Sequence, residues 1–121
     1  MIQVTTAMRV LVAIEPVDFR RGIDGLAQVC RQQLQQDPMR GWIFVFRNRR
    51  RTAVKLLAFD GHGFWLCQKR LSQGRFRWWP GSTGHEPGRF LQAHELQVLV
   101  SGGNPDAVGG APVWRPVVVG Q

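Results

Sequence analysis

The residues of this chain most suited to chemistry are four arginines in the stretch Arg47-Asn48-Arg49-Arg50-Arg51. Guanidinium groups bind phosphate oxygens in pairs and stack on flat rings, which ammonium groups do poorly. The asparagine among them can contact a base edge or stabilise a turn. The stretch therefore predicts a hairpin tip that clasps a nucleic-acid backbone. The alternative is a solvated loop that only keeps the protein soluble.

The central block of the chain shares this basic character. Between Pro38 and His85 lie ten of the sixteen basic residues and one acid, Asp60, so the block has a net charge of +9 and the rest of the chain −1. Four of the five tryptophans lie in the same block. Basic residues interleaved with aromatics are typical of a surface that meets a polyanion, and DNA is the expected partner. The predicted nucleic-acid-binding residues are Arg47, Asn48, Arg49, Arg50, Arg51, Lys55, Lys69, Arg70, Arg75, Arg77 and Trp79.

Aromatic side chains of the block are candidate stacking platforms for unpaired bases. The candidates are Phe64, Trp65, Trp78 and Trp79. Aromatics in strands more often belong to a core, which is the competing interpretation. Trp79 is the best platform candidate because alternation along a strand would put it on one face with Arg75 and Arg77.

Catalytic groups are harder to find. Asp18, Asp24 and Asp60 could gather around magnesium, as in a metal-dependent nuclease, but Asp18 also suits a helix cap and Asp60 a turn. The three histidines lack metal-ligand spacing, no nucleophile pairs with a base, and no glycine loop is built to cradle phosphate. The sequence therefore predicts no enzyme, no metal site and no cofactor.

The first third of the chain predicts a strand followed by a helix. Residues 8–14 (MRVLVAI) are short, branched and apolar, as in a buried strand. Asp18 is placed to cap a helix whose apolar stripe runs from Phe19 to Leu34, and Asp37-Pro38 ends that segment. This helix is expected to pack on one face of a sheet.

The basic block predicts four strands at residues 42–46, 53–59, 64–69 and 75–79. The connections between them are short, so neighbouring strands must be antiparallel, as in a meander. Alternation places Phe76 and Trp78 on one face of the last strand, with Arg75 and Arg77 as a basic outer row.

Beyond Pro80, residues 81–88 predict a loop and Phe90 to Val100 a short amphipathic helix. Residues 101–121 are rich in glycine and proline, as in a flexible tail, with an apolar extended segment from Val113 to Val119. The expected architecture is α+β: one domain over residues 1–100, with an antiparallel β-meander, an N-terminal strand, a packed helix and a short C-terminal helix.

Length and composition limit the kinds of protein that this chain can be. A chain of 121 residues that is 44% hydrophobic is long enough for one core. It shows no signal peptide and no apolar run of about 20 residues, so we expect a cytoplasmic protein with no membrane partner. Its two cysteines, Cys30 and Cys67, are expected to be free thiols. The sequence leaves homo-oligomerisation open.

Several spaced motifs resemble the TnpB family of accessory proteins from insertion sequences of the IS sixty-six type. Residues 16–26 (PVDFRRGIDGL) match its P-x-D-M-R-K-G-x-D-G-L signature, and residues 44–50 (FVFRNRR) match a second run. Further matches are KLL at 55–57, DGHGFWL at 60–66, KRL at 69–71 and GRFRW at 74–78, with a weaker one in EL at 95–96 and Leu99. The departures are Phe19, Arg21 and the second tryptophan, Trp79, and the chain beyond Gly103 matches no motif.

The resemblance implies a bacterial mobile element in which this protein assists transposition while a separate, larger protein is the transposase. The RNA-guided nucleases that share the TnpB name are a different family. Two further hypotheses stand beside DNA binding. The protein could dock on the transposase of the same element without touching DNA, or, on its three aspartates alone, be a nuclease.

Overall fold

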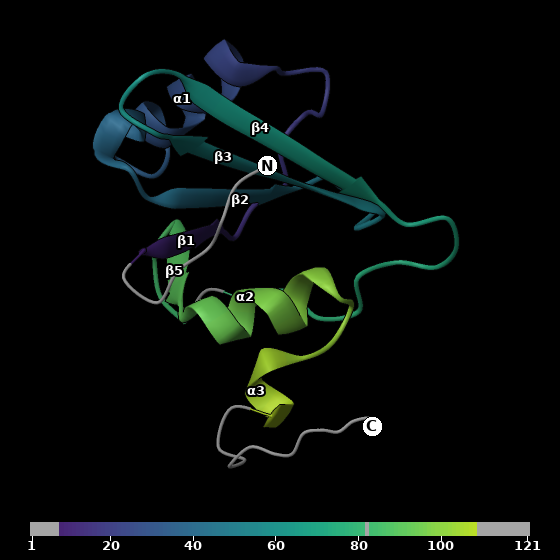
Figure 1. Cartoon of the computed structure of the whole chain (residues 1–121). Coiled ribbons are helices and arrows are strands. Elements are labelled where there is room, and N and C mark those ends of the chain that lie inside the picture. Colours follow the sequence, from purple (N-terminus) through teal and green to yellow (C-terminus); the bar gives the residue numbers. More distant parts are fainter. Residues whose placement is uncertain (1–7, 82, 109–121) are drawn as a thin grey trace.

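The computed structural model describes residues 8–81 and 83–108, which form an α+β fold around one five-stranded sheet (Figure 1). The sheet order is β4-β3-β2-β1-β5. The strands are β1 (Val10–Ala13), β2 (Ile43–Arg47), β3 (Ala53–Phe59), β4 (Phe64–Arg70) and β5 (Gly88–Leu91). The helices are α1 (Ile23–Gln32), the 3-10 turn η1 (Pro38–Arg40), α2 (Ala93–Val100) and α3 (Pro105–Val108).

An antiparallel meander of β2, β3 and β4 forms most of the sheet, and the N-terminal strand joins it, both as predicted. β1 pairs with β2 in parallel, so α1 must run back along the sheet between them. The sheet therefore has two distinct ends. The turn end carries residues 48–52 between β2 and β3, and the opposite end carries residues 60–63, η1 and the last turn of α1.

Two apolar clusters cover the two faces of the sheet. Alternation in β1 places Val10 and Val12 in one cluster and Leu11 in the other. α1 covers the Leu11 face, whereas α2 covers the Val10 face through Leu96 and Leu99. The two helices thus lie on opposite faces of the sheet, and β4 and β5 are its two edge strands (Figure 1).

The prediction that Asp18 caps the first helix is wrong. α1 begins at Ile23 with Gly22 at its N-cap, and the Asp18 carboxylate instead accepts hydrogen bonds from the backbone and guanidinium of Arg20. The predicted apolar stripe is also longer than the helix, because Phe19 precedes α1 and Leu34 follows it. Both side chains still pack in the cluster that α1 covers.

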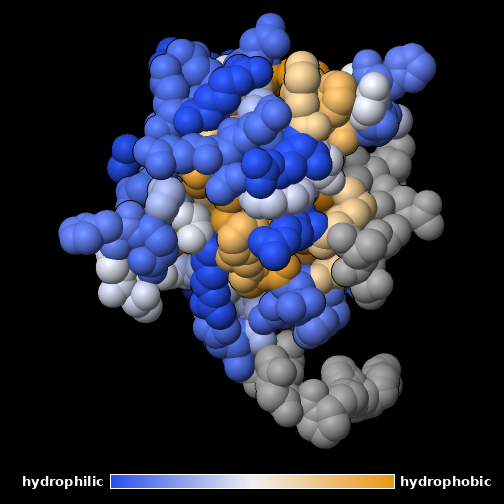
Figure 2. Space-filling view, turned by 90° about the vertical axis from the view of Figure 1, so that its left-hand side faces the viewer, coloured by the Kyte–Doolittle hydropathy of each residue, from blue (hydrophilic) through white to orange (hydrophobic). Residues whose placement is uncertain are grey.

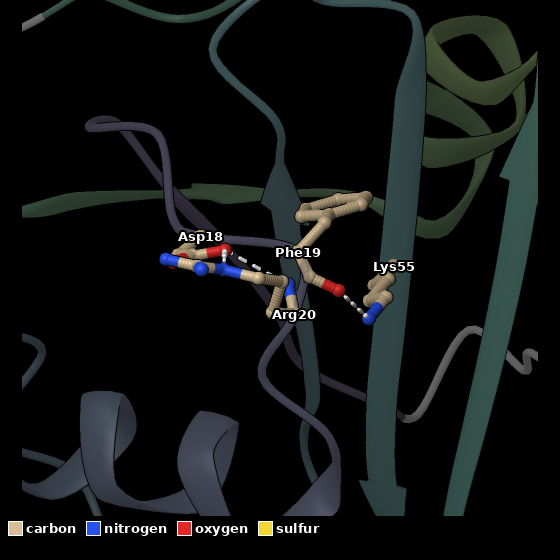
Figure 3. Close-up of polar contacts among 4 residues, drawn as sticks. All are labelled: Asp18, Phe19, Arg20 and Lys55. Atoms are coloured by element: carbon tan, nitrogen blue, oxygen red, sulfur yellow. Dashed lines mark hydrogen bonds and ion pairs between the residues drawn. The ribbon is translucent and has the colours of Figure 1, made fainter.

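Lys55 explains why the helix starts late. Its Nζ donates to the carbonyl oxygen of Phe19 at 2.9 Å (Figure 3) and lies 4.8 Å from the centre of the Phe19 ring. It also donates to the carbonyl oxygen of Arg21 at 2.9 Å. Carbonyls held in this way toward β3 cannot accept the bonds of a first helical turn. The ammonium therefore fastens to β3 a turn at residues 18–21, which the Arg21 N–H closes by donating to the carbonyl oxygen of Asp18.

The expected strand at residues 75–79 is not a strand. Phe76 and Trp79 are both buried, with 1% and 6% of their surface exposed, and both pack in the Val10 cluster together with α2. The indole Nε1 of Trp79 also donates to the carbonyl oxygen of Ala13 at 2.8 Å. Burial of residues three apart is incompatible with strand alternation, so this segment instead crosses the face of the sheet.

The C-terminal part also differs from the prediction. Residues 88–91, expected as loop and helix, form β5 along β1, and α2 begins only at Ala93 behind a capping box of Gln92 and Glu95. Residues 105–108 of the expected tail form α3. The predicted extended segment from Val113 to Val119 lies outside the described residues. None of the helices in the described part has the length and apolar composition needed to span a bilayer.

Replacing Lys55 with methionine is expected to lower the free energy of unfolding by about 1–3 kcal/mol, because two loop carbonyls lose a charged donor. The control is Lys69→Met, which removes an exposed ammonium that donates to one carbonyl oxygen, that of Val100, and should cost about 1 kcal/mol or less because water can replace this bond. Urea titration followed by tryptophan fluorescence measures both. Equal losses in the two variants would contradict the fastening role of Lys55.

The two cysteines are free, as predicted, and should differ in reactivity. Burial raises the pKa of the Cys30 thiol to about 12, whereas Cys67 is only half-buried on β4. Because the thiolate is the reactive form, a thiol reagent at pH 8 should label Cys67 in the folded protein and Cys30 only after unfolding. Spectrophotometric thiol counting tests this, with Cys67→Ser as the control that should not react when folded.

Candidate nucleic-acid interface

The arginine stretch forms the tight turn between β2 and β3, and Asn48 organises it. The Asn48 Oδ1 accepts from the backbone N–H groups of Thr52 at 2.9 Å and Ala53 at 3.2 Å. Its Nδ2 donates to Thr52 Oγ1 at 2.8 Å, and Arg51 adopts a left-handed φ of 59°. Of the two roles open to Asn48, the structure therefore gives it the one in the turn.

A second basic segment is tied directly to this turn. The N–H of Phe76 donates to the carbonyl oxygen of Arg51 at 2.7 Å, and the Arg51 guanidinium reaches the carbonyl oxygen of Arg77 at 3.4 Å. Burial of Phe76 thus leaves the exposed side chains of Arg75 and Arg77 beside the turn. The two segments enclose a hollow of about 580 Å³, which we call the arginine hollow; its lining is Arg49, Arg50, Arg51, Gly74, Arg75, Phe76 and Arg77.

No carboxylate neutralises the arginine hollow. The eight Asp and Glu residues all lie in the described part of the chain, and none lines this hollow. Five of the eight act locally by accepting hydrogen bonds from backbone N–H groups of nearby turns and helix starts, namely Asp18, Asp37, Asp60, Glu86 and Glu95. Within residues 8–81 and 83–108 the two ion pairs are Arg20–Asp18 and Arg89–Asp106. The five guanidinium groups of the hollow therefore lack an acidic partner in this part of the chain.

Arg47 supports the turn from beneath. Its guanidinium donates to the carbonyl oxygens of Asn48 and Arg49 and lies 5.9 Å from the centre of the Trp79 ring. Its Nε is buried without a hydrogen-bond partner among the described residues. Burial, followed by the nearby charge of Arg51, lowers the pKa of Arg47. Arg47 is therefore a half-buried member of the predicted set that shapes the turn.

A second hollow of about 440 Å³ lies on the other side of Arg49 and Arg50. Its lining is Pro16, Val17, Asp18, Phe19, Asn48, Arg49 and Arg50. Asp18 there forms a 2.6 Å ion pair with Arg20, whose hydrogen bonds lower the pKa of this carboxyl to about 2 (Figure 3). Residues from the first and second resemblance motifs thus meet at this hollow, although they lie far apart in the chain.

Two predicted contact residues are not at the surface, and these predictions need correction. Lys55 is 6% exposed, and its ammonium is directed to the loop carbonyls described above. Trp79 is also 6% exposed and belongs to the core, so it offers no platform to a base. Both errors have one cause: the expected alternation took no account of chain segments packed over the faces of the sheet.

The other predicted residues lie near the turn end but are spread out. Arg70 is exposed at the end of β4. Lys69 precedes it, and its Nζ donates to the last carbonyl oxygen of α2, that of Val100, at 2.7 Å. Arg40, which belongs to the basic block of the sequence, lies at the opposite end with its guanidinium 4.7 Å from the centre of the Trp42 ring.

Of the stacking candidates, Trp65 is the most exposed, at 43%, and its Nε1 donates to the Asp60 carboxylate. Phe64 and Trp78 are half-buried.

Sequence reasoning missed Phe90, which is 47% exposed and packs edge-on against Trp42, with the Arg9 guanidinium over both rings. Figure 2 views the opposite end of the molecule, where hydrophobic patches appear among hydrophilic side chains. Phe90 was missed because its strand was read as helix.

A metal site on Asp18, Asp24 and Asp60 receives no geometric support. Among residues 8–81 and 83–108, no group of three or more His, Cys, Asp and Glu side chains could hold a metal ion. Asp60 instead accepts bonds from the backbone of His62 and Gly63, as expected of a turn residue.

Comparison with known proteins gives this site its context. The family model described as IS66 Orf2 like protein matches residues 8–109. Uncharacterized protein y4jC of Sinorhizobium fredii (strain NBRC 101917 / NGR234) is 37% identical over 119 residues, which cover 98% of this chain and 99% of that protein. Uncharacterized protein y4hO of the same organism is 35% identical over 113 residues, covering 93% and 94%. No solved structure matches. The chain therefore belongs to the IS66 Orf2-like family of insertion-sequence accessory proteins.

Proposed function

We propose that this protein assists transposition by binding DNA at the turn end of its sheet. The observation that carries the proposal is the arginine hollow: five guanidinium groups from two chain segments share one concave surface, and no acid lines it. Guanidinium forks grip phosphate oxygens in pairs, and a concave row of them can follow a nucleic-acid backbone. The contacts are to phosphate, so the proposal predicts affinity with a strong electrostatic part and little direct reading of bases.

Three groups of residues have distinct roles in this proposal. Arg49, Arg50, Arg75 and Arg77 make the phosphate contacts, because their side chains are exposed around the hollow. Asn48, Arg47 and Arg51 hold the turn in shape through their hydrogen bonds. Arg70 and Lys69 extend the basic surface along the end of β4. DNA and the transposase of the same element are the proposed partners.

A second function is favoured by a different observation. Trp65 and Phe90 are exposed at 43% and 47%, and large exposed aromatics often anchor protein partners. A module that docks on the transposase without DNA contact would use such residues. Transposase affinity that is insensitive to salt, together with no DNA binding even at low salt, would favour this function over the first.

Replacing Arg49 and Arg50 with glutamine is expected to weaken DNA binding and flatten its salt dependence. Each phosphate contact contributes about one unit to the slope of log affinity against log salt, so the slope should fall by about two units. Fluorescence anisotropy with labelled duplex and single-stranded DNA, including the terminal repeats of the element, measures this. The control Arg31→Gln/Arg40→Gln removes the same charge at the opposite end of the sheet and should leave the slope unchanged. An equal loss in both variants would mean that net charge, not this surface, drives binding.

The pair Arg75→Gln/Arg77→Gln tests whether the two segments act as one surface. We expect a loss of slope similar to that of the Arg49/Arg50 pair, about two units, because both pairs line the same hollow. Thermal unfolding of each variant checks that Phe76 stays packed. Wild-type binding by this variant would restrict the contact to the turn.

A further inference from the structure

The edge strand β4 has one side of its backbone unpaired in the described part of the chain. β4 is seven residues long and pairs with β3 along its whole length, whereas no other described strand lies beside it. An exposed edge of this length is a template for pairing with another strand. The other sheet edge, β5, is only four residues long.

Two hydrogen bonds fix which backbone groups of β4 point outward. The N–H of Leu71 donates to the carbonyl oxygen of Thr52, and the N–H of Asp60 donates to that of Gly63. These bonds direct the odd-numbered residues of β4 toward β3, because bonded and non-bonded residues alternate in an antiparallel pair. The N–H and C=O groups of Phe64, Leu66, Gln68 and Arg70 therefore face outward.

We propose that two copies of this chain pair through β4, antiparallel, with Cys67 on the two-fold axis. This register is the one that pairs all seven residues of the strand with all seven of the second copy, since Cys67 is the central residue of Phe64–Arg70. It places Phe64 opposite Arg70, Trp65 opposite Lys69, and Leu66 opposite Gln68. Its backbone bonds run through the outward-facing residues, as the ladder requires.

The side chains of this register are complementary. Each aromatic at the start of one strand meets a cation at the end of the other, and cations attract aromatic faces. The Asp60 carboxylate, bound to the Trp65 indole at 2.8 Å, brings a negative charge to the side of the strand where Lys69 of the second copy lies. One N–H of that ammonium donates to Val100 within its own copy, and two remain. Like charges are kept apart, because Lys69 and Arg70 of the two copies lie at opposite ends of the paired strands.

The same residues admit an opposing role. Lysine and arginine on an edge strand can protect it from pairing, in which case β4 would remain single. The interface made by one strand pair is also smaller than the about 800 Å² per partner of a standard stable complex, so the dimer should be reversible. The two roles predict different contacts. A protected edge places no residue of a second copy beside Trp65, whereas the dimer places Lys69 of the second copy opposite it.

Cross-linking through the native Cys67 tests the register. In a non-hydrogen-bonded antiparallel pair the Cα atoms lie about 4.5 Å apart, within the range of about 4.4–6.8 Å that a disulfide spans. Diamide, as the oxidant, should link the two Cys67 thiols of the folded full chain, while buried Cys30 stays free. The control is Cys67→Ser/Ser72→Cys, whose exposed cysteine lies just beyond the strand and should cross-link about tenfold more slowly. Equal rates for the two proteins would overturn the proposal.

Backbone variants test the pairing without cysteine chemistry. Gln68→Pro removes an outward N–H that β3 does not use, whereas Gln68→Ala keeps it; proline is tolerated at such edge positions. Sedimentation of the wild type should show a concentration-dependent dimer, weakened about tenfold by Gln68→Pro and little by Gln68→Ala. Trp65→Lys, which places two cations opposite each other, is a second variant with the same expectation.

Two results would contradict the dimer. One is a wild-type protein that stays monomeric at all concentrations. The other is a monomer in which the outward β4 amides are protected from hydrogen exchange, if that protection disappears when residues 109–121 are removed. In that case the chain's own terminal segment, and not a second copy, would occupy the edge. Neither result bears on DNA binding by the arginine hollow, which is measured separately.

Discussion

The burial of Phe76 and Trp79 against the sheet is the contact on which the basic surface of this protein depends. It holds residues 75–79 across the face as an extended crossing, and the bond from the Phe76 N–H to Arg51 joins that crossing to the arginine turn. Arg75 and Arg77 flank a core residue, so they must emerge beside it. A hydrophobic contact thereby decides where four charged side chains, those of Arg49, Arg50, Arg75 and Arg77, come together.

The distribution of charge separates the acids from most of the arginines. The acids of the chain mostly accept hydrogen bonds in turns and at helix starts, where a carboxylate satisfies otherwise unpaired N–H groups. One of its two lysines, Lys55, is buried and fastens the 19–21 loop to β3. The arginines are left in surplus at the surface, because few acids remain to pair with them. That surplus, together with membership of the IS66 Orf2-like family, is what makes DNA the first partner to examine.

The edge strand adds a second surface with different chemistry. The arginine hollow binds through charge, whereas β4 offers backbone groups flanked by aromatics and cations. In the proposed dimer the two-fold axis at Cys67 makes the two β4 strands antiparallel and joins the two sheets into one. The basic turn ends of the two copies therefore lie at opposite ends of the strands, far from each other. A protein arranged in this way would present two separate phosphate-binding surfaces.

Local sequence determined the strand–helix order, the β2-β3-β4 meander, the turn role of Asp60 and the arginine turn, because alternation, turn residues and charge act over a few neighbouring positions. Only the tertiary structure decided that Asp18 leaves the helix, that Lys55 and Trp79 are buried, that residues 75–79 cross the sheet and that residues 88–91 pair with β1. Each of these depends on a partner far away in the chain: a loop carbonyl for Lys55, the carbonyl of Ala13 for Trp79, and the free edge of β1 for β5. Periodicity shows which residues can be buried, but long-range packing selects which of them are.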